Sequence, residues 1–299
     1  MTAPLIVIGS ANTDYTVVVD RHPQPGETLL GGDVTTGTGG KGANQALAAA
    51  RAGGRPVLLA AVGADATGRA LLEALGSSGV DVSNVAIDAD APTGVALIIV
   101  ARDGENTIVV APGANGRLDA ESVAARVAEL AGAGCVLLAQ LEVPLAVVEA
   151  AAAAIDRAGG RVVLNLSPSR PVSDSLLALC DPLVVNETEA ADLVAAPVDG
   201  PVPAAAAAAA LLERCRSVVI TLGGEGAVFA ARDGGAGPVS GHRPAPRVEV
   251  VDTTGAGDAF VGTLAAELAE GDDLEAAVEL GVAAGAAAVQ WLGAQPPQR

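Results

Sequence analysis

The sequence has very few aromatic residues: only 1% of its 299 residues are Phe, Trp or Tyr, although 51% are apolar. A core of this composition must be built from Ala, Val and Leu, and the 37 glycines allow backbones to approach closely. Small, closely packed residues favour helices layered on a sheet. At this length the chain can form one large α/β domain or two modest ones, and either buries enough surface to be stable.

Basic residues are also scarce. There are 17 lysines and arginines against 35 aspartates and glutamates, so the formal net charge at pH 7 is -18. This charge repels a phosphate backbone and no basic cluster offsets it, which argues against nucleic acids and anionic membranes as partners. A single nucleotide remains compatible, because backbone N–H groups and a metal ion can hold its phosphates.

Cysteine is limited to Cys135, Cys180 and Cys215, which are far apart in apolar or helical stretches. This pattern indicates reduced core thiols in a cytosolic protein. A catalytic cysteine is the alternative, but neither of the two histidines lies in a recognisable motif. No apolar run reaches the ~18 residues of a membrane span and no basic leader precedes the first strand, so we expect a soluble, unexported, cytoplasmic protein.

Strand-like and helical segments alternate along most of the chain. An apolar run at 5–8 predicts a buried parallel strand that delivers a polar turn, Gly9–Asp14, at its carboxyl end. Further strands are expected at 56–62, 134–139, 161–166, 182–185 and 217–222, and helices at 42–51, 67–76, 145–158, 173–179, 187–195, 256–270 and 273–290. This alternation predicts an α/β fold in one domain, with a mostly parallel sheet covered by helices on both faces.

Two hairpin-like segments break this rhythm. One is apolar and surrounds the sequence ARDGEN, and the other is interrupted by an HPQPG turn. The strands expected in them are 15–20, 28–34, 93–100 and 106–111. We expect them to form a separate small β-sheet, a lid made by about 13–37 and 93–111.

The most informative motif is VDTTGAGDAFVGTL at 251–264, where a polar turn opens an apolar helix. Gly255, Ala256 and Gly257 have little or no side chain, so their N–H groups can approach an anion at the positive end of the helix. A carboxylate beside a bound γ-phosphate can take the proton of an attacking hydroxyl, which makes Asp258 a candidate general base. The alternative is that Asp258 only stabilises the helix N-terminus.

A second glycine-rich turn, GTGGKGANQAL at 37–47, also opens a helix. It contains Lys41, the only lysine in the chain. The spacing is not that of a Walker A loop, which needs four residues between its first glycine and a Gly-Lys followed by Ser or Thr. We interpret the turn as suited to a polyol, with Lys41 and Asn44 as candidate contacts. A solvated turn residue is the alternative for Lys41.

Polar residues follow several predicted strands, at the edge where an open α/β sheet binds ligands. They are Asn12, Asp14, Glu142, Asn186 and Glu189. Carboxylates and amides bind vicinal hydroxyls well, so Asn12, Asp14 and Glu142 could recognise a sugar. Each could instead be a local cap, because Asn and Asp favour such turns. The turn TLGGEGA at 221–227 could lie against a nucleotide.

In their order and spacing, these segments resemble the ribokinase-like, phosphofructokinase-B-type carbohydrate kinase family. The resemblance covers nearly the whole chain through GSANTDY, PGET, GGKGANQA, TGVALI, GAN, the Gln140–Glu142 turn, NETEA, TLGGEG, DTTGAGD and GAQP. It implies a three-layer ribokinase-like α/β fold with a small β-sheet lid. The implied activity is the phosphorylation of D-ribose at its 5-hydroxyl by MgATP, in a homodimer formed through the lid.

The resemblance also implies roles for individual residues, with Asp258 as the catalytic base. Positions that match sugar contacts are Ala11, Asn12, Asp14, Gly40, Lys41, Gly42, Asn44, Glu142 and Asp258. Positions that match nucleotide contacts are Asn186, Thr221, Gly223, Gly224, Gly226, Gly255, Ala256, Gly257 and Val282. Glu189 matches a residue that organises Mg²⁺ through water. Positions that match a potassium site built largely of backbone carbonyls are Asp252, Thr254, Ala288, Trp291 and Gly293.

Two features depart from the family pattern. Pro297 stands where a serine is expected, so one potassium ligand would be lost or replaced by water. The chain ends at Arg299, where relatives usually continue into a further helix, and we expect some cost in stability or assembly and little in chemistry.

Two other functions stay open from the sequence. A kinase of the same fold could act on 2-deoxyribose, fructose or a nucleoside, although Asn12 and Asp14 favour a ribose with both lower hydroxyls. A catalytically silent sugar-binding or regulatory protein is the other, and the intact Asp258 beside its glycine turn argues against it.

Overall fold

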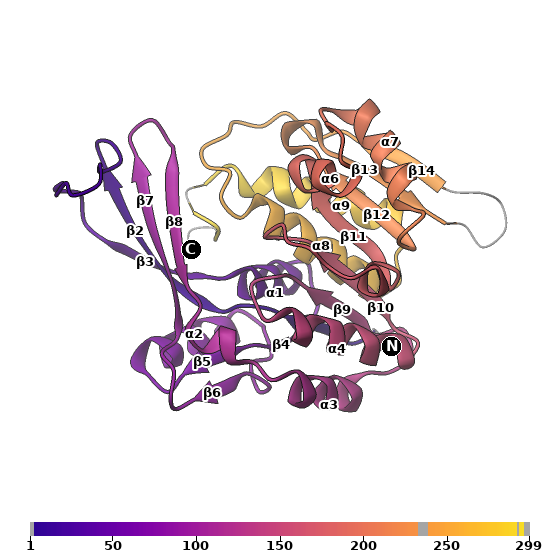
Figure 1. Ribbon diagram of the computed structural model, residues 1–299, viewed down its shortest axis with the longest axis horizontal. Helices are drawn as coiled ribbons and strands as arrows, with labels where there is room; N and C mark the ends of the chain where they lie inside the picture. Colours follow the sequence, from indigo (N-terminus) through magenta and orange to yellow (C-terminus); the bar gives the residue numbers. More distant parts are fainter. Residues whose placement is uncertain (1–2, 233–238, 292, 296–299) are drawn as a thin grey trace.

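The computed structural model describes residues 3–232, 239–291 and 293–295 (Figure 1). Its largest element is an eight-stranded sheet in the order β14-β13-β12-β11-β10-β9-β1-β4. Neighbouring strands from β4 to β12 in this order are parallel, and β13 and β14 are antiparallel to their neighbours. The strands are β1 Leu5–Ile8, β4 Pro56–Leu59, β9 Val136–Ala139, β10 Arg161–Asn165, β11 Cys180–Asn186, β12 Ser217–Thr221, β13 Ala227–Ala231 and β14 Val239–Arg243.

Successive side chains of a strand point to opposite faces of this sheet, so each face has its own core. In β1, Ile6 and Ile8 belong to one core, and Leu5 and Val7 to the other. The first core includes residues of α3 to α7, and the second includes residues of α1, α2, α8 and α9. The helices are α1 Lys41–Arg51, α2 Ala66–Ser77, α3 Ala120–Leu130, α4 Leu145–Arg157, α5 Asp174–Leu177, α6 Glu187–Val194, α7 Pro201–Leu211, α8 Ala256–Glu270 and α9 Leu274–Ala288. The predicted three-layer α/β fold is confirmed.

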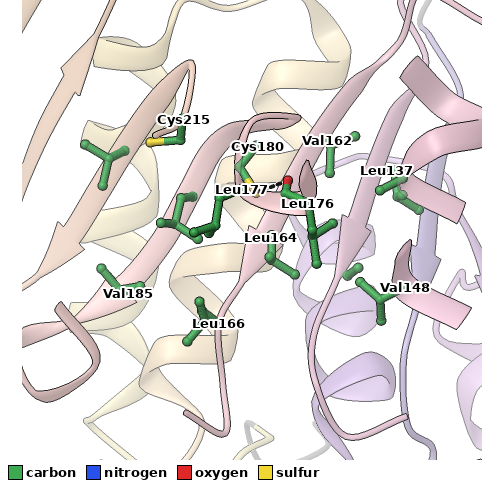
Figure 2. Packing of buried hydrophobic residues seen from close by; sticks show 14 of the residues in the cluster. Leu137, Val148, Val162, Leu164, Leu166, Leu176, Leu177, Cys180, Val185 and Cys215 are labelled. Atoms are coloured by element: carbon green, nitrogen blue, oxygen red, sulfur yellow. Dashed lines mark hydrogen bonds between the residues drawn. The ribbon is translucent and has the colours of Figure 1, made fainter. Parts of the chain in front are cut away.

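Small aliphatic side chains fill the first core, as the composition predicts (Figure 2). Leu137 and Leu164 are completely buried there, and Cys180 and Cys215 belong to the same core. These two cysteines and Cys135 are free and buried. Burial raises the pKa of the Cys180 thiol strongly and that of Cys215 to about 11. The thiols therefore stay protonated and unreactive at neutral pH, which disfavours a catalytic cysteine.

A second sheet, of four strands, extends away from the main one (Figure 1). Its order is β3-β2-β7-β8, with β2 Asn12–Val19, β3 Thr35–Gly39, β7 Gly94–Ala101 and β8 Asn106–Ala111. The predicted β7–β8 hairpin is present, and β7 joins β2 in parallel. The prediction of a strand at 28–34 is wrong, because β2 pairs with β3 instead. Gly31, Gly32 and Asp33 disfavour a strand, whereas β3 is rich in β-branched threonine.

Two boundaries also differ from the sequence prediction. The polar turn after β1 is shorter than expected, because β2 already begins at Asn12. The predicted strand at 56–62 is two strands in different sheets: β4 joins the main sheet, whereas β5 (Ala61–Gly63) pairs with β6 (Ala86–Asp88). Among the described residues, no helix is long and apolar enough to cross a membrane.

Candidate active site

The candidate residues gather where the parallel strands of the main sheet end. A cleft of about 160 Å³ opens at this edge. Its lining includes Lys41, Asn186, Glu189, Thr221, Gly257 and Asp258. The structure thus brings together residues that the sequence assigned separately to sugar, nucleotide and catalysis, as expected for ligand binding at the carboxyl ends of parallel strands.

Asp258 lies in the first turn of α8, behind a glycine that shapes the turn. Gly255 caps this helix with φ 77°, a left-handed conformation that favours glycine. No atom lies within 4 Å of the place where a Cβ on Gly257 would stand, so the backbone there is open to a ligand. The N–H of Ala256 already donates to the carbonyl of Thr253 at 3.2 Å. The rest of the helix start remains suited to an anion.

Two amides from α1 hold the carboxylate of Asp258. Asn44 Nδ2 donates to Oδ2 at 3.2 Å, and Gln45 Nε2 donates to Oδ1 at 2.9 Å. The helices can approach because residue 262 of α8 is glycine: a Cβ there would lie 2.3 Å from the backbone oxygen of Gln45. Burial raises the pKa of Asp258, while the charge of Lys41 and the two amide bonds lower it. The site therefore keeps a partly desolvated carboxylate that is held by two amide donors and lines the cleft.

The GGKG turn packs directly on the loop that follows β1. Gly40 caps α1 with φ 85°, and a Cβ on it would lie 2.8 Å from the carbonyl oxygen of Ser10. A Cβ on Gly42 would lie 2.6 Å from the carbonyl carbon of Gly9. These predicted sugar contacts are glycines because the two backbones touch. Lys41, between them, lines the cleft.

Two further carboxylates, Glu142 and Asp14, lie near Asp258. Glu142, which follows β9, accepts hydrogen bonds from the Lys41 N–H at 3.0 Å and from the hydroxyl of Ser10. Burial, reinforced by the charges of Glu142 and Asp258, raises the pKa of Asp14 to about 7. The buried Oδ1 of Asp14 has no hydrogen-bond partner among the described residues. A buried acceptor without a donor is suited to a ligand hydroxyl.

Asn12 and Ala11 are fully enclosed and are oriented by a residue that the sequence did not assign to the site. Asn12 Oδ1 accepts from Asn115 Nδ2 at 2.8 Å. Asn115 also accepts from the Ala11 N–H at 3.0 Å and donates to the Ala11 carbonyl at 3.1 Å. Asn115 was visible in the sequence only within the GAN segment.

On the nucleotide side, Asn186 and Glu189 form a reciprocal capping box at the start of α6. Asn186 Oδ1 accepts from the Glu189 N–H at 2.8 Å, and the Glu189 carboxylate accepts from the Asn186 N–H at 2.9 Å. The two residues therefore form the local helix cap that was the alternative interpretation, and both also line the cleft. Burial raises the pKa of Glu189.

The other predicted nucleotide contacts lie around the end of β12. Gly223 and Gly224 begin the short 3-10 helix η2 (Gly223–Glu225), where a Cβ would meet no atom within 4 Å. Gly226 has φ 92°, and a Cβ on it would lie 1.9 Å from the carbonyl oxygen of Arg243. Val282, in α9, is only 7% exposed and packs into the second core.

Of the predicted potassium residues, Thr254 and Gly293 contact Asp252. Its Oδ1 accepts from the Thr254 N–H and hydroxyl at 2.9 and 2.7 Å, and its Oδ2 accepts from the Gly293 N–H at 2.8 Å. Ala288, the last residue of α9, is buried, and the indole Nε1 of Trp291 is buried without a partner among the described residues. Pro297 lies outside the described residues. Within them, no group of three or more His, Cys, Asp and Glu side chains gathers as for a metal held by side chains.

Comparison with known proteins identifies the family. Residues 3–299 match the family described as pfkB family carbohydrate kinase. The chain belongs to this family. Ribokinase of Haemophilus influenzae is 39% identical over 296 residues, covering 99% of this chain and 95% of that protein. The structure of Arabidopsis thaliana ribokinase complexed with ribose and ATP is 33% identical, with TM-score 0.86 over 98% of this chain and 95% of that one. The structure of Escherichia coli phosphofructokinase-2 in complex with potassium is 26% identical, with TM-score 0.80 over 98% and 94%.

Three buried amides of this pfkB-family chain were not predicted as part of the site. They are Gln45, Gln140 and Asn165, which connect to one another and to Asp258. The sequence carries a weak signal for two of them: Gln140 and Asn165 each end an apolar strand segment, in VLLAQL and VVLNL. Gln45 gave no such signal, because its burial depends on how closely α1 and α8 pack.

Proposed function

We propose that this pfkB-family chain transfers the γ-phosphoryl group of ATP to the 5-hydroxyl of D-ribose and releases D-ribose 5-phosphate and ADP. The position of Asp258 carries the proposal. Its carboxylate lines one cleft with Asn186 and Thr221, and it accepts a hydrogen bond from Asn44 of the GGKGAN turn. The ribokinase relatives, one of them bound to ribose and ATP, support the choice of substrates.

In the proposed reaction, the 5-hydroxyl gives its proton to the carboxylate of Asp258. The freed oxygen forms a bond to the γ-phosphorus while the bond from that phosphorus to the bridging oxygen of ADP breaks, and the electron pair leaves with ADP. The open N–H groups around Gly257 and the Mg²⁺ that enters with ATP stabilise the charge that develops. Positioning and electrostatics therefore supply most of the catalysis.

The sugar would be held between the GGKG turn and the start of β2. Its proposed contacts are Ala11, Asn12, Asp14, Gly40, Lys41, Gly42, Asn44 and Glu142. Support comes from the unpartnered Oδ1 of Asp14 and from the placement of Glu142 against the same turn. The nucleotide would lie over the residues after β11 and β12, with Asn186, Thr221, Gly223, Gly224, Gly226, Gly255, Ala256, Gly257 and Val282 as proposed contacts.

Two ions belong to this proposal. Glu189 would organise the Mg²⁺ of ATP through water, since its carboxylate lines the cleft. Asp252, Thr254, Ala288, Trp291 and Gly293 would hold potassium. These residues fit such an ion. Both oxygens of Asp252 accept backbone N–H groups, from Thr254 and Gly293, and so join two segments of the chain. With these oxygens occupied, backbone carbonyls would be the ligands. A bound potassium ion would supply positive charge near the phosphates, and the potassium complex of phosphofructokinase-2 supports its presence.

The four-stranded sheet would serve as the lid and as the surface of a homodimer. The sheet borders the sugar side, because β2 begins at Asn12 and contains Asp14. Its exposed large apolar side chains are Val18, Leu97, Ile108, Val109 and Val110. Leu97 and Val109 lie on one face of the sheet, and Val18, Ile108 and Val110 on the other. Exposed apolar side chains such as these are candidates for burial by a partner, here a second copy of the chain.

We place the protein in the cytoplasm, where its free thiols would stay reduced.

A coupled assay of ADP release tests the function. D-ribose, 2-deoxyribose, fructose and a nucleoside would be compared, with and without potassium, and the phosphorylated carbon would be identified by NMR. We expect D-ribose to give the highest kcat/KM, phosphorylation at carbon 5, and faster turnover with potassium. A higher kcat/KM with another sugar would contradict D-ribose as the substrate. Tight sugar binding without ADP release would favour a silent sugar-binding protein.

A further inference from the structure

The amide of Gln45 is completely buried, and both its Nε2 and its Oε1 are hydrogen-bonded. Nε2 donates to Asp258 Oδ1 at 2.9 Å and to Asn165 Oδ1 at 3.0 Å, and Oε1 accepts from Gln140 Nε2 at 2.6 Å. Asn165 and Gln140 are also buried, with 9% and 0% of their surface exposed. A buried chain of hydrogen bonds of this kind has a preferred arrangement, because each amide fixes the orientation of the next.

The orientation of the Gln45 amide follows from its neighbours. Asp258 offers only acceptors when ionised, and Asn165 turns its Oδ1 toward Gln45 because its Nδ2 donates to the Val184 carbonyl at 3.4 Å. A flipped Gln45 would place its own oxygen against two acceptors. The donor end of this amide must therefore face Asp258.

Gln140 supports the same direction from the other side. It donates to Gln45, which donates to Asp258, so two amide dipoles point their positive ends toward the carboxylate. The buried Oε1 of Gln140 has no partner among the described residues. An unpaired buried acceptor is unfavourable, so this orientation of Gln140 serves Gln45 rather than Gln140 itself.

We infer that Gln45, aligned by Gln140, is a positioning residue for the general base: it holds Oδ1 of Asp258 and leaves Oδ2 for the sugar hydroxyl. The inference rests on the proposed kinase function. Among the residues that the structure describes, Oδ2 is bonded only by the longer contact from Asn44, at 3.2 Å, and so retains capacity to accept a proton. Gln45 also favours the ionised form of the base, because it donates to the charged state.

Other charges face Asp258 as well. Lys41 lowers its pKa, whereas Glu142 raises it. Asp14, on β2, is coupled to Asp258 through their mutual repulsion. All three are present in a Gln45 variant, so a change in the titration of Asp258 on replacing Gln45 would report the lost amide and not the remaining charges.

The test replaces Gln45 by Met, which keeps the length of the side chain and removes its donors. We expect kcat with D-ribose to fall by about 10- to 100-fold, as for loss of a hydrogen bond to a charged group. KM for both substrates should stay within about threefold, and the acid limb of the pH profile of kcat should move upward by about one pH unit or more. Gln140→Met, which leaves Gln45 free to turn, should shift the profile in the same direction by a smaller amount.

Ser217→Ala is the matched control. Ser217 is the first residue of β12, at the end away from the cleft residue Thr221, and the substitution removes its part-buried hydrogen bond to Asp181. It should lower thermal stability and leave the pH profile in place. The positioning role is refuted if Gln45→Met loses stability as this control does while the acid limb stays where it was. It is also refuted if KM rises and kcat does not change.

A second readout separates this inference from the proposed function. The carboxyl pKa of Asp258 can be followed by carbon-13 NMR in the substrate-free protein, with Asp258→Asn to assign the signal. A raised pKa in Gln45→Met supports the contact even if the parent phosphorylates no sugar, in which case only the proposed function fails. An unchanged pKa in a parent that phosphorylates ribose rejects the role of Gln45 alone.

Discussion

Asn44 Nδ2 lies 3.2 Å from Asp258 Oδ2, although 214 positions separate the two residues in the chain. The contact joins the turn that resembles a sugar site to the turn that resembles a phosphate site. Asn44 is itself oriented from a third segment, because its Oδ1 accepts from Gln295 Nε2 at 2.8 Å. The carboxylate of Asp258, the GGKGAN turn and the segment after α9 are thus connected by consecutive hydrogen bonds.

Asp258→Asn should remove most turnover and leave binding intact. The amide keeps the shape of the side chain but cannot accept a proton, so kcat should fall by ~100-fold or more. Calorimetric titration should still detect ribose and ATP. A variant rate within about tenfold of the parent would show that another group is the base.

Two glycines of the same turn should respond differently to alanine. At Gly255, φ is 77° and a Cβ would lie 2.7 Å from the Cα of Ala294, so Gly255→Ala should lower the free energy of unfolding by about 1 kcal/mol or more. At Gly257 a Cβ meets no atom, so stability should stay within about 0.5 kcal/mol of the parent. Its methyl group would occupy space beside the transferred phosphoryl, so kcat/KM for ATP should drop at least ~10-fold. Thermal unfolding and kinetics on the pair would reveal whether the two effects separate.

Asp14 should make ribose binding depend on pH near neutrality. Its pKa is raised to about 7, so the carboxyl is protonated below that pH and ionised above it. The ionised form accepts hydroxyl hydrogen bonds better, so Kd for ribose should decrease from pH 6 to pH 8, by at most about tenfold per pH unit. Titration of the parent without ATP avoids turnover and keeps the charge of Asp258, which contributes to the raised pKa of Asp14. Asp14→Asn should abolish this dependence, and persistence of the slope in that variant would assign it to a different group.

The same shift should affect stability with the opposite sign. The pKa of Asp14 in the folded protein, about 7, is above its ordinary value of 3.8, so the folded state binds the proton more tightly than the unfolded chain does. The stabilisation is complete below pH 4 and is lost as pH rises through 7. The free energy of unfolding of Asp14→Asn, taken relative to that of the parent, should therefore be larger at pH 8 than at pH 4, by at least ~1 kcal/mol. Denaturant unfolding at the two pH values measures this gain, and equal differences would contradict it.

Gly262→Ala should weaken catalysis through packing alone. A Cβ at this position would lie 2.3 Å from the Gln45 carbonyl oxygen and 2.6 Å from the Cβ of Ala48, so α1 and α8 must move apart. We expect a loss of about 1–3 kcal/mol in stability, together with a lower kcat. Gly76→Ala on α2, where a Cβ meets only Val82 at 3.7 Å, is the matched control and should leave kcat unchanged. Normal turnover in Gly262→Ala would show that the spacing of the helices does not set the geometry of Asp258.

Local patterns predicted the elements of the fold better than the contacts between them. Alternating apolar segments gave the three layers, and the glycine turns gave the cleft residues, because both depend on short stretches of chain. The strand misplaced at 28–34 shows the limit: Leu29, Leu30 and Val34 look strand-like, but pairing with β2 selects the threonines of β3 instead. Gln45 shows a second limit: it lies in the helix expected at 42–51, and only tertiary packing decides that this polar side chain is fully buried.

The order of the strands has a consequence for biosynthesis. β1 and β4 come from the first fifth of the sequence, yet Asp258, the proposed base, comes from α8, near the end. The core that contains Leu5 and Val7 of β1 likewise includes Phe260 and Leu264 of α8. A nascent polypeptide therefore cannot complete either this core or the proposed site until α8 has left the ribosome.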